Sequence, residues 1–115
     1  MVERSTDPQL SEVLKAASDP TRRAILTLLA QEGPLRVGEI HARFEISLNA
    51  VSKHIKVLES AGLVARRTEW REHLIEVQMG PLRVIDDWFA SLRSIWDLRL
   101  EALDKLITQG AAKDD

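Results

Sequence analysis

The chain has 115 residues, which is enough for one domain with a hydrophobic core and too few for a second, catalytic domain. With 44% hydrophobic and 30% charged residues, its composition is that of a folded globular protein and excludes a disordered or fibrous one. The net charge is −2 and cysteine is absent. Disulfides and thiolate metal sites are therefore excluded, and no overall basic charge signals a nucleic-acid partner.

The first residues form a polar stretch, MVERSTDPQ, that predicts a flexible tail over residues 1–9. This stretch lacks the basic start and the apolar run of an export signal, so we expect a cytoplasmic protein with no membrane insertion. After it, Leu10, Val13, Leu14 and Ala17 recur at helical spacing and predict a short first helix.

The second predicted helix begins at Asp19-Pro20, where an N-cap residue is followed by proline at the first helical position. It ends at Gly33-Pro34, because glycine favours a helix C-terminus and proline cannot continue the helix. A short third helix is predicted over residues 37–44.

The fourth predicted helix has two chemically different faces. Ser47 can cap its start, and Val51, Ile55 and Leu58 form a core-facing stripe. The opposite face is polar and basic, and no acidic residue occurs between Ser47 and Leu58. Its polar positions are Asn49, Ser52, Lys53 and Lys56, with His54 on the flank.

A β-hairpin is predicted after the fourth helix. Gly62 can adopt the left-handed conformation that ends the helix. Two strands over residues 63–67 and 74–78 follow, joined by the charged connection 68–73. This connection has no Asn-Gly turn signal, so the hairpin rests on the strand pattern alone.

The last predicted element is a long helix over residues 82–107, opened by Gly80-Pro81 and followed by a polar tail over 109–115. Its apolar surface is wider than a single core-facing stripe requires, so we expect part of it to face another subunit. Together these elements predict one mainly α domain over residues 10–108, with about five helices and a small β-hairpin: a winged helix-turn-helix.

The chain resembles the ArsR family of bacterial transcriptional regulators from about Leu14 to the final helix. The resemblance rests on LKAASDPTRRAILTLL at 14–29, VGEIHARFEIS at 37–47 and VSKHIKVLESAGLVARR at 51–67, followed by the hairpin and the long helix. It implies a homodimer on double-stranded DNA, with each fourth helix in a major groove and each wing near the flanking backbone or minor groove.

The polar side chains of the fourth helix support DNA binding independently of the resemblance, because amide, hydroxyl and cationic groups can reach base edges and phosphates. Strand alternation means that Arg66 and Arg67 cannot both face the duplex. Many similar sequences have glycine near the wing tip where this chain has Trp70, so the wing's mode of contact stays open, with local packing of Trp70 as the alternative.

The predicted DNA-binding residues are Asn49, Ser52, Lys53, His54, Lys56, Arg66, Arg67 and Arg71. The predicted dimer contacts are Leu10, Val13, Trp88, Leu92 and Trp96.

Many members of the family sense metals through cysteine in the third helix or through histidine and acidic residues in the last. This chain has no cysteine, and no histidine follows His73. The resemblance therefore points to the metal-independent, autorepressor-like branch, with no inducing metal and no cofactor. Three sources of regulation of DNA binding stay open: a protein partner, a small molecule, or the expression level of the protein alone.

These observations predict a sequence-specific DNA-binding repressor that recognises an inverted repeat and has no catalytic activity. One alternative is a winged-helix protein-interaction module without DNA binding, which an acidic or apolar fourth helix would favour. A small enzyme is the other alternative, but the chain has no nucleophile elbow, phosphate loop or metal-spaced pair.

Overall fold

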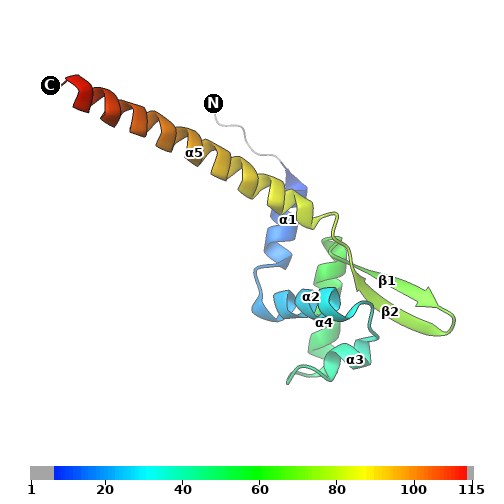
Figure 1. Ribbon diagram of the computed structural model, residues 1–115. Helices are drawn as coiled ribbons and strands as arrows, with labels where there is room; N and C mark the ends of the chain where they lie inside the picture. The colour runs from blue at the N-terminus through cyan, green and yellow to red at the C-terminus, as the bar shows by residue number, and fades with distance from the viewer. Residues whose placement is uncertain (1–6, 114–115) are drawn as a thin grey trace. The chain divides into compact units, whose positions relative to one another are not determined.

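The computed structural model describes residues 7–113, and the side chains of residues 7–110. It divides into one unit that ends at Ile85 and a second that begins at Asp86. Within the described residues, five helices and one antiparallel hairpin confirm the predicted fold class (Figure 1). In chain order they are α1 (Pro8–Ala16), α2 (Pro20–Glu32), α3 (Val37–His41), α4 (Leu48–Ser60), β1 (Val64–Glu69), β2 (Glu72–Val77) and α5 (Leu82–Lys113).

Helices α1 and α2 begin in the same way. The Asp7 carboxylate accepts hydrogen bonds from two backbone N–H groups of the first turn, at 3.0 and 3.3 Å, and Pro8 follows it. At α2 the Asp19 carboxylate accepts the Arg22 backbone N–H at 3.0 Å, and Pro20 follows it. Because Asp7-Pro8 is a complete start signal, α1 begins earlier than the predicted tail over 1–9 allows. Residues 1–6 of that tail lie outside the described residues.

Helix α3 is shorter than predicted, because it ends at His41 and not at Phe44. After it, the backbone N–H groups of Arg43 and Phe44 bond to carbonyls three residues earlier, at 3.0 and 3.1 Å. This tighter winding is typical of helix ends. It leads the chain into the turn before α4, where Phe44 and Ile46 pack against the core.

Helix α4 has the predicted start, core face and end. The Ser47 hydroxyl accepts the backbone N–H three residues later at 3.1 Å. Val51, Ile55 and Leu58 are fully buried. Gly62 has a φ of +77°, which glycine adopts without strain, and the chain turns there into the hairpin.

The hairpin is longer and its loop tighter than predicted. Glu69 pairs with Glu72, so only Trp70 and Arg71 form the loop, whereas the sequence suggested a connection over 68–73. Trp70 has a φ of +67°, the left-handed conformation that two-residue hairpin loops require at their first position. Glycine or asparagine normally fills this position, so a tryptophan gave no turn signal in the sequence.

A single core connects the hairpin with the helices of the first unit. Leu35 and Ile75 exchange backbone hydrogen bonds of 3.0 and 2.8 Å, which tie the segment before α3 to β2. Leu82 and Ile85, in the first turn of α5, also pack against this core. The buried residues are Val13, Ala16, Ile25, Leu26, Leu28, Leu29, Ile40, Val51, Ile55, Leu58, Leu63, Val64 and Ile75.

Helix α5 is one continuous helix of 32 residues that extends beyond the predicted end at residue 107. The predicted polar tail over 109–115 is therefore helical as far as Lys113, and residues 114–115 lie outside the described part. Gly110 costs a helix only about 1 kcal/mol relative to alanine. Two alanines follow it, which are the strongest helix formers, so the helix continues through this position.

Candidate nucleic-acid interface

The outer face of α4 is free of the protein's own packing. Asn49, Lys53 and Lys56 are exposed and Ser52 is half-buried, while the opposite face lies in the core. Neither lysine forms an ion pair with any residue that the structure describes. The fold therefore brings these four predicted residues together on one basic, solvent-facing surface.

His54 takes a different direction from these residues. Its side chain is 23% exposed, and its Nδ1 atom lies 3.9 Å from Asp19 Oδ2 and 3.4 Å from Arg22 Nη1. Both partners belong to the start of α2. This placement favours a role for His54 in holding α4 against α2 over a direct contact with DNA.

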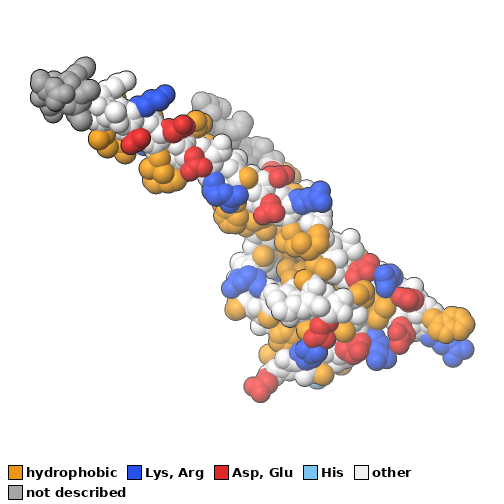
Figure 2. Space-filling model, in the orientation of Figure 1, with side chains coloured by type: hydrophobic (Ala, Val, Ile, Leu, Met, Phe, Trp, Pro, Cys, Tyr) orange, Lys and Arg blue, Asp and Glu red, His pale blue; other side chains and the backbone are white. Residues whose placement is uncertain are grey.

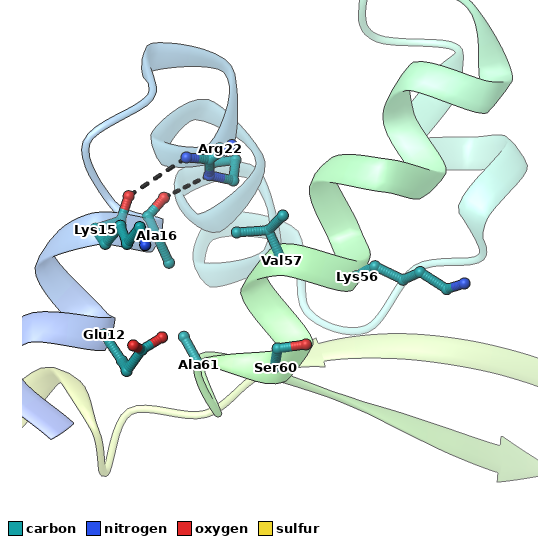
Figure 3. Close-up of a pocket in the computed structure, with 8 residues that line it drawn as sticks. All are labelled: Glu12, Lys15, Ala16, Arg22, Lys56, Val57, Ser60 and Ala61. Carbon is teal, nitrogen blue, oxygen red and sulfur yellow. Dashed lines mark hydrogen bonds between the residues drawn. The ribbon is translucent and has the colours of Figure 1, made fainter. Parts of the chain in front are cut away.

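Arg22 is a residue whose role the sequence analysis missed. Its Nε donates to the Ala16 carbonyl at 2.6 Å and its Nη2 to the Lys15 carbonyl at 3.3 Å (Figure 3). The pKa of Asp19 is lowered, chiefly by the hydrogen bond that its carboxylate accepts from the Arg22 backbone N–H. Arg22 thus joins the end of α1, the start of α2 and the flank of α4. An arginine two residues after the Asp-Pro start of α2 is the signal that could have found it.

A groove of about 440 Å³ separates α1 from the C-terminal half of α4. Val57, Ala16 and Ala61 contribute its apolar lining, and Glu12 extends into it from α1 (Figure 3). Lys56 also borders the groove, but its side chain extends away from α1 and α2 (Figure 3). The ammonium group is therefore available on the outer side of α4.

The two arginines in β1 are engaged within the chain. Arg66 Nε lies 3.2 Å from both carboxylate oxygens of Glu59 on α4. Arg67 contacts Glu69 at 2.9 Å and Glu76 at 3.1 Å, on the other face of the hairpin. Each arginine would have to exchange an acidic partner for a phosphate, so the structure makes both weaker candidates for DNA contact.

The wing tip, formed by Trp70 and Arg71, is the most exposed part of the hairpin. The Trp70 side chain is 91% exposed, so it does not pack locally. Arg71 is exposed and makes no ion pair with a described residue. Of the three predicted wing arginines, only Arg71 presents a guanidinium that the fold does not already use.

The predicted dimer contacts divide into buried and exposed residues. Val13 is fully buried in the core of its own unit, so it has no surface to offer a second subunit and leaves the predicted set. Leu10 is half-buried. On α5, Trp88, Leu92 and Trp96 expose 38%, 44% and 59% of their surfaces. Such exposure is high for large apolar side chains.

Residues 7–113 show neither a metal site nor a membrane-spanning helix. No group of three or more histidine, aspartate or glutamate side chains in this range is placed to hold a metal ion. No helix in the same range is long and apolar enough to cross a membrane.

Residues 17–67 match a family model described as a helix-turn-helix domain. Over 56 residues the chain is 41% identical to the transcriptional repressor SdpR of Bacillus subtilis, in a match that covers 49% of this chain and 61% of the repressor. Its matches to three curated relatives span 49%, 61% and 66% of those proteins' own lengths.

Solved structures are similar over more of the chain. The crystal structure of an ArsR family transcriptional regulator is 31% identical, with a TM-score of 0.72 over 81% of this chain and 96% of that one. The solution structure of a homodimeric winged helix-turn-helix DNA-binding domain from Mycobacterium bovis is 28% identical, with a TM-score of 0.60 over 84% and 91%. Because the sequence identity extends over almost the whole of the first of these structures, the chain belongs to the ArsR family of winged helix-turn-helix transcriptional regulators.

Proposed function

We propose that this protein is a dimeric, sequence-specific DNA-binding repressor that places α4 in the major groove. The observation that carries the proposal is the outer face of α4, where Asn49, Lys53 and Lys56 are exposed and both lysines are free of ion pairs within the described residues. An α-helix fits the major groove of B-form DNA. Amide and cationic side chains bind base edges there, and cationic side chains bind phosphates.

Each residue on this face suits a particular contact. Asn49, in the first turn of α4, can bind adenine N6 and N7 with both atoms of its amide. Ser52 and Lys53 follow on the same side, and lysine can reach guanine O6 and N7 or a phosphate. Lys56 lies one turn further along the helix, where a phosphate contact would fix the orientation of the helix without reading sequence.

We propose that a second copy of the chain covers the apolar surface of α5. Seven apolar residues recur along α5 at spacings of four, three, four, four, three and four. Because eleven residues make just over three full turns, this stripe stays on one side of the helix along its whole length. The residues are Ile85, Phe89, Leu92, Trp96, Leu100, Leu103 and Ile107.

The exposure of this stripe supports a dimer. Phe89, Leu92, Trp96, Leu100, Leu103 and Ile107 are each between 44% and 63% exposed. A continuous apolar surface of this length is unfavourable in water unless another surface covers it. A twofold dimer would present two α4 helices to successive major grooves and so favour an inverted repeat. The related M. bovis domain is a homodimer.

We also propose that no metal ion induces release from DNA. The absence of cysteine and of any histidine after His73 supports this.

The family comprises transcriptional regulators and not enzymes. The similar protein SdpR is a transcriptional repressor, which supports repression as the mode of regulation. A protein-interaction module without DNA binding is disfavoured, because the exposed face of α4 carries no acidic residue between Ser47 and Leu58.

The test begins with selection of duplexes from a randomised pool by the full-length protein. Affinity for the selected duplex is then measured by fluorescence anisotropy over a range of salt concentrations. Lys53→Ala should weaken binding at least tenfold and reduce the slope of log K against log salt by about 0.9, because one phosphate contact is lost. Lys105→Ala on α5 makes the same change in charge and should have no effect. Failure to enrich any sequence would contradict the proposal.

A further inference from the structure

Trp70 is a large side chain that the fold itself does not use. A buried tryptophan removes about 150–250 Å² of surface from water, but Trp70 is 91% exposed. Its φ of +67° adds a second cost, because a side chain with a Cβ atom is strained in this region. Neither packing nor backbone geometry explains a tryptophan here, and residues held in such conformations are frequent at functional sites.

The wing holds Trp70 in a defined position. Glu69 and Glu72, immediately before and after the loop, face each other in the strand register. In the next pair, Thr68 Oγ1 lies 3.3 Å from His73 Nδ1. Further back, β2 is bound to the segment before α3 through Ile75. The hairpin projects beyond α2, α3 and α4 (Figure 1). The loop is therefore short, and the paired strands on either side of it fix its position.

Arg71 offers an anionic partner the one guanidinium at the tip that forms no ion pair with a described residue. Glu69 is paired with Arg67 at 2.9 Å, and Glu72 with Arg36 at 3.5 Å. Arg71 has no such partner among the described residues, and hydrophobic and basic side chains lie together at the hairpin tip (Figure 2). Glu69 and Glu72 thus each have a cationic partner within the protein, although Arg67 also contacts Glu76 and Arg36 also contacts Glu39, whereas the Arg71 guanidinium is left for a phosphate.

We propose that Trp70 is a DNA-contacting specificity residue: its indole inserts into the minor groove beside the site of α4, while Arg71 binds the adjacent phosphate. This inference rests on the proposed DNA-binding function. Apolar side chains that enter the minor groove partly unstack a base step. Pyrimidine–purine steps unstack most easily, so Trp70 would select TA or CA/TG steps at positions that α4 never touches.

Selection from a randomised duplex pool tests this preference directly. The wild-type protein should enrich pyrimidine–purine steps at a fixed distance outside the sequence read by α4. Trp70→Ala should enrich the same central sequence and lose the flanking preference. Trp70→Phe should retain part of the preference, because it keeps an aromatic ring. An identical flanking preference in the wild type and Trp70→Ala would overturn the inference.

Affinity measurements separate the two residues of the tip. On the selected duplex, Trp70→Ala should weaken binding about tenfold without changing the salt dependence, because an uncharged side chain releases no counterions. Arg71→Ala should reduce the slope of log K against log salt by about 0.9. A protein partner at the tip, in place of DNA, would leave both the affinity and the slope unchanged in Trp70→Ala, and that result would refute the inference.

Two further measurements keep the test independent of folding defects and of the function as a whole. Trp70→Gly should raise the melting temperature, since glycine adopts a φ of +67° without strain, yet should weaken DNA binding as Trp70→Ala does. The tryptophan fluorescence of Trp70 is obtained by subtracting the emission of Trp70→Phe, which retains Trp88 and Trp96, from that of the wild type. The selected duplex should quench this fluorescence. If Lys53→Ala loses binding while all Trp70 variants match the wild type, the inference fails and the DNA-binding function stands. If the wild type selects no duplex, the proposed function itself fails.

Discussion

The Arg22 guanidinium lies 3.4 Å from His54 Nδ1 and also donates hydrogen bonds to two carbonyls at the end of α1. One side chain therefore connects α1 with α4, which carries the candidate reading face. A helix that reads base edges must be held in a defined orientation, since a small shift misaligns each hydrogen bond. The geometry thus assigns positioning to His54, although its place on the flank of the reading face suggested direct contact.

Substitution of His54 should separate positioning from contact. His54→Ala should lower the free energy of unfolding by about 0.5–1.5 kcal/mol through the lost interaction with Arg22, and should leave the salt dependence of DNA binding unchanged. Lys53→Ala should show the reverse: unchanged stability and a smaller salt slope. Urea denaturation and salt-dependent anisotropy measure the two effects. A reduced salt slope in His54→Ala would show that His54 binds phosphate after all.

Asp19 should make the stability depend on pH in the acidic range. Its pKa is lower in the folded protein than in the unfolded chain, because its carboxylate caps α2. Its stabilising contribution is complete above the unfolded-state pKa and is lost as the pH falls through the folded-state pKa. Asp19→Asn retains a capping side chain that does not titrate, so its stability should fall less steeply on acidification. Urea denaturation at a series of pH values tests this; parallel curves for the two proteins would contradict it.

Asn49 should determine base preference and not overall affinity for DNA. Asn49→Ala removes an amide that can bind adenine, which is worth about 1–3 kcal/mol of discrimination at one base pair. Selection from a randomised pool should therefore show one relaxed position in each half-site, with nonspecific binding unchanged. Ser60→Ala, at the far end of the same helix, is the matched control and should select the wild-type sequence. If Asn49→Ala selects the same sequence as the wild type, Asn49 reads no base.

A charge within the apolar stripe of α5 should prevent dimerisation. Leu92→Glu would place an unpaired carboxylate between two subunits, which is strongly unfavourable. At micromolar concentration, sedimentation should give about twice the chain mass of 13.0 kDa for the wild type and a single chain for the variant. Ser94→Glu adds the same charge on the opposite side of the helix, given 100° of rotation per residue, and should remain dimeric. A wild type that sediments as one chain would contradict the proposed dimer.

Helix starts and the core face of α4 could be predicted because their signals are local. Asp19-Pro20 and Ser47 cap helices through groups within one turn, and the apolar spacing of α4 identifies Val51 and Ile55 as buried. Asp7-Pro8 carries the same local signal as Asp19-Pro20, so the start of α1 was predictable in principle. The tight loop at Trp70 was not, because its φ of +67° is imposed by the pairing of the two strands and not favoured by the residue.

The sequence by itself determined the fold class, the order of the elements and the basic outer face of α4. Periodicity, caps and turn residues act over a few positions, so they can be read without knowing what packs against what. Only the tertiary structure decided which predicted residues are available to a partner. It buried Val13, paired Arg66 with Glu59 and turned His54 toward Arg22, while it left Trp70 exposed. These outcomes depend on contacts between residues distant in the chain, and such contacts leave no mark on local spacing.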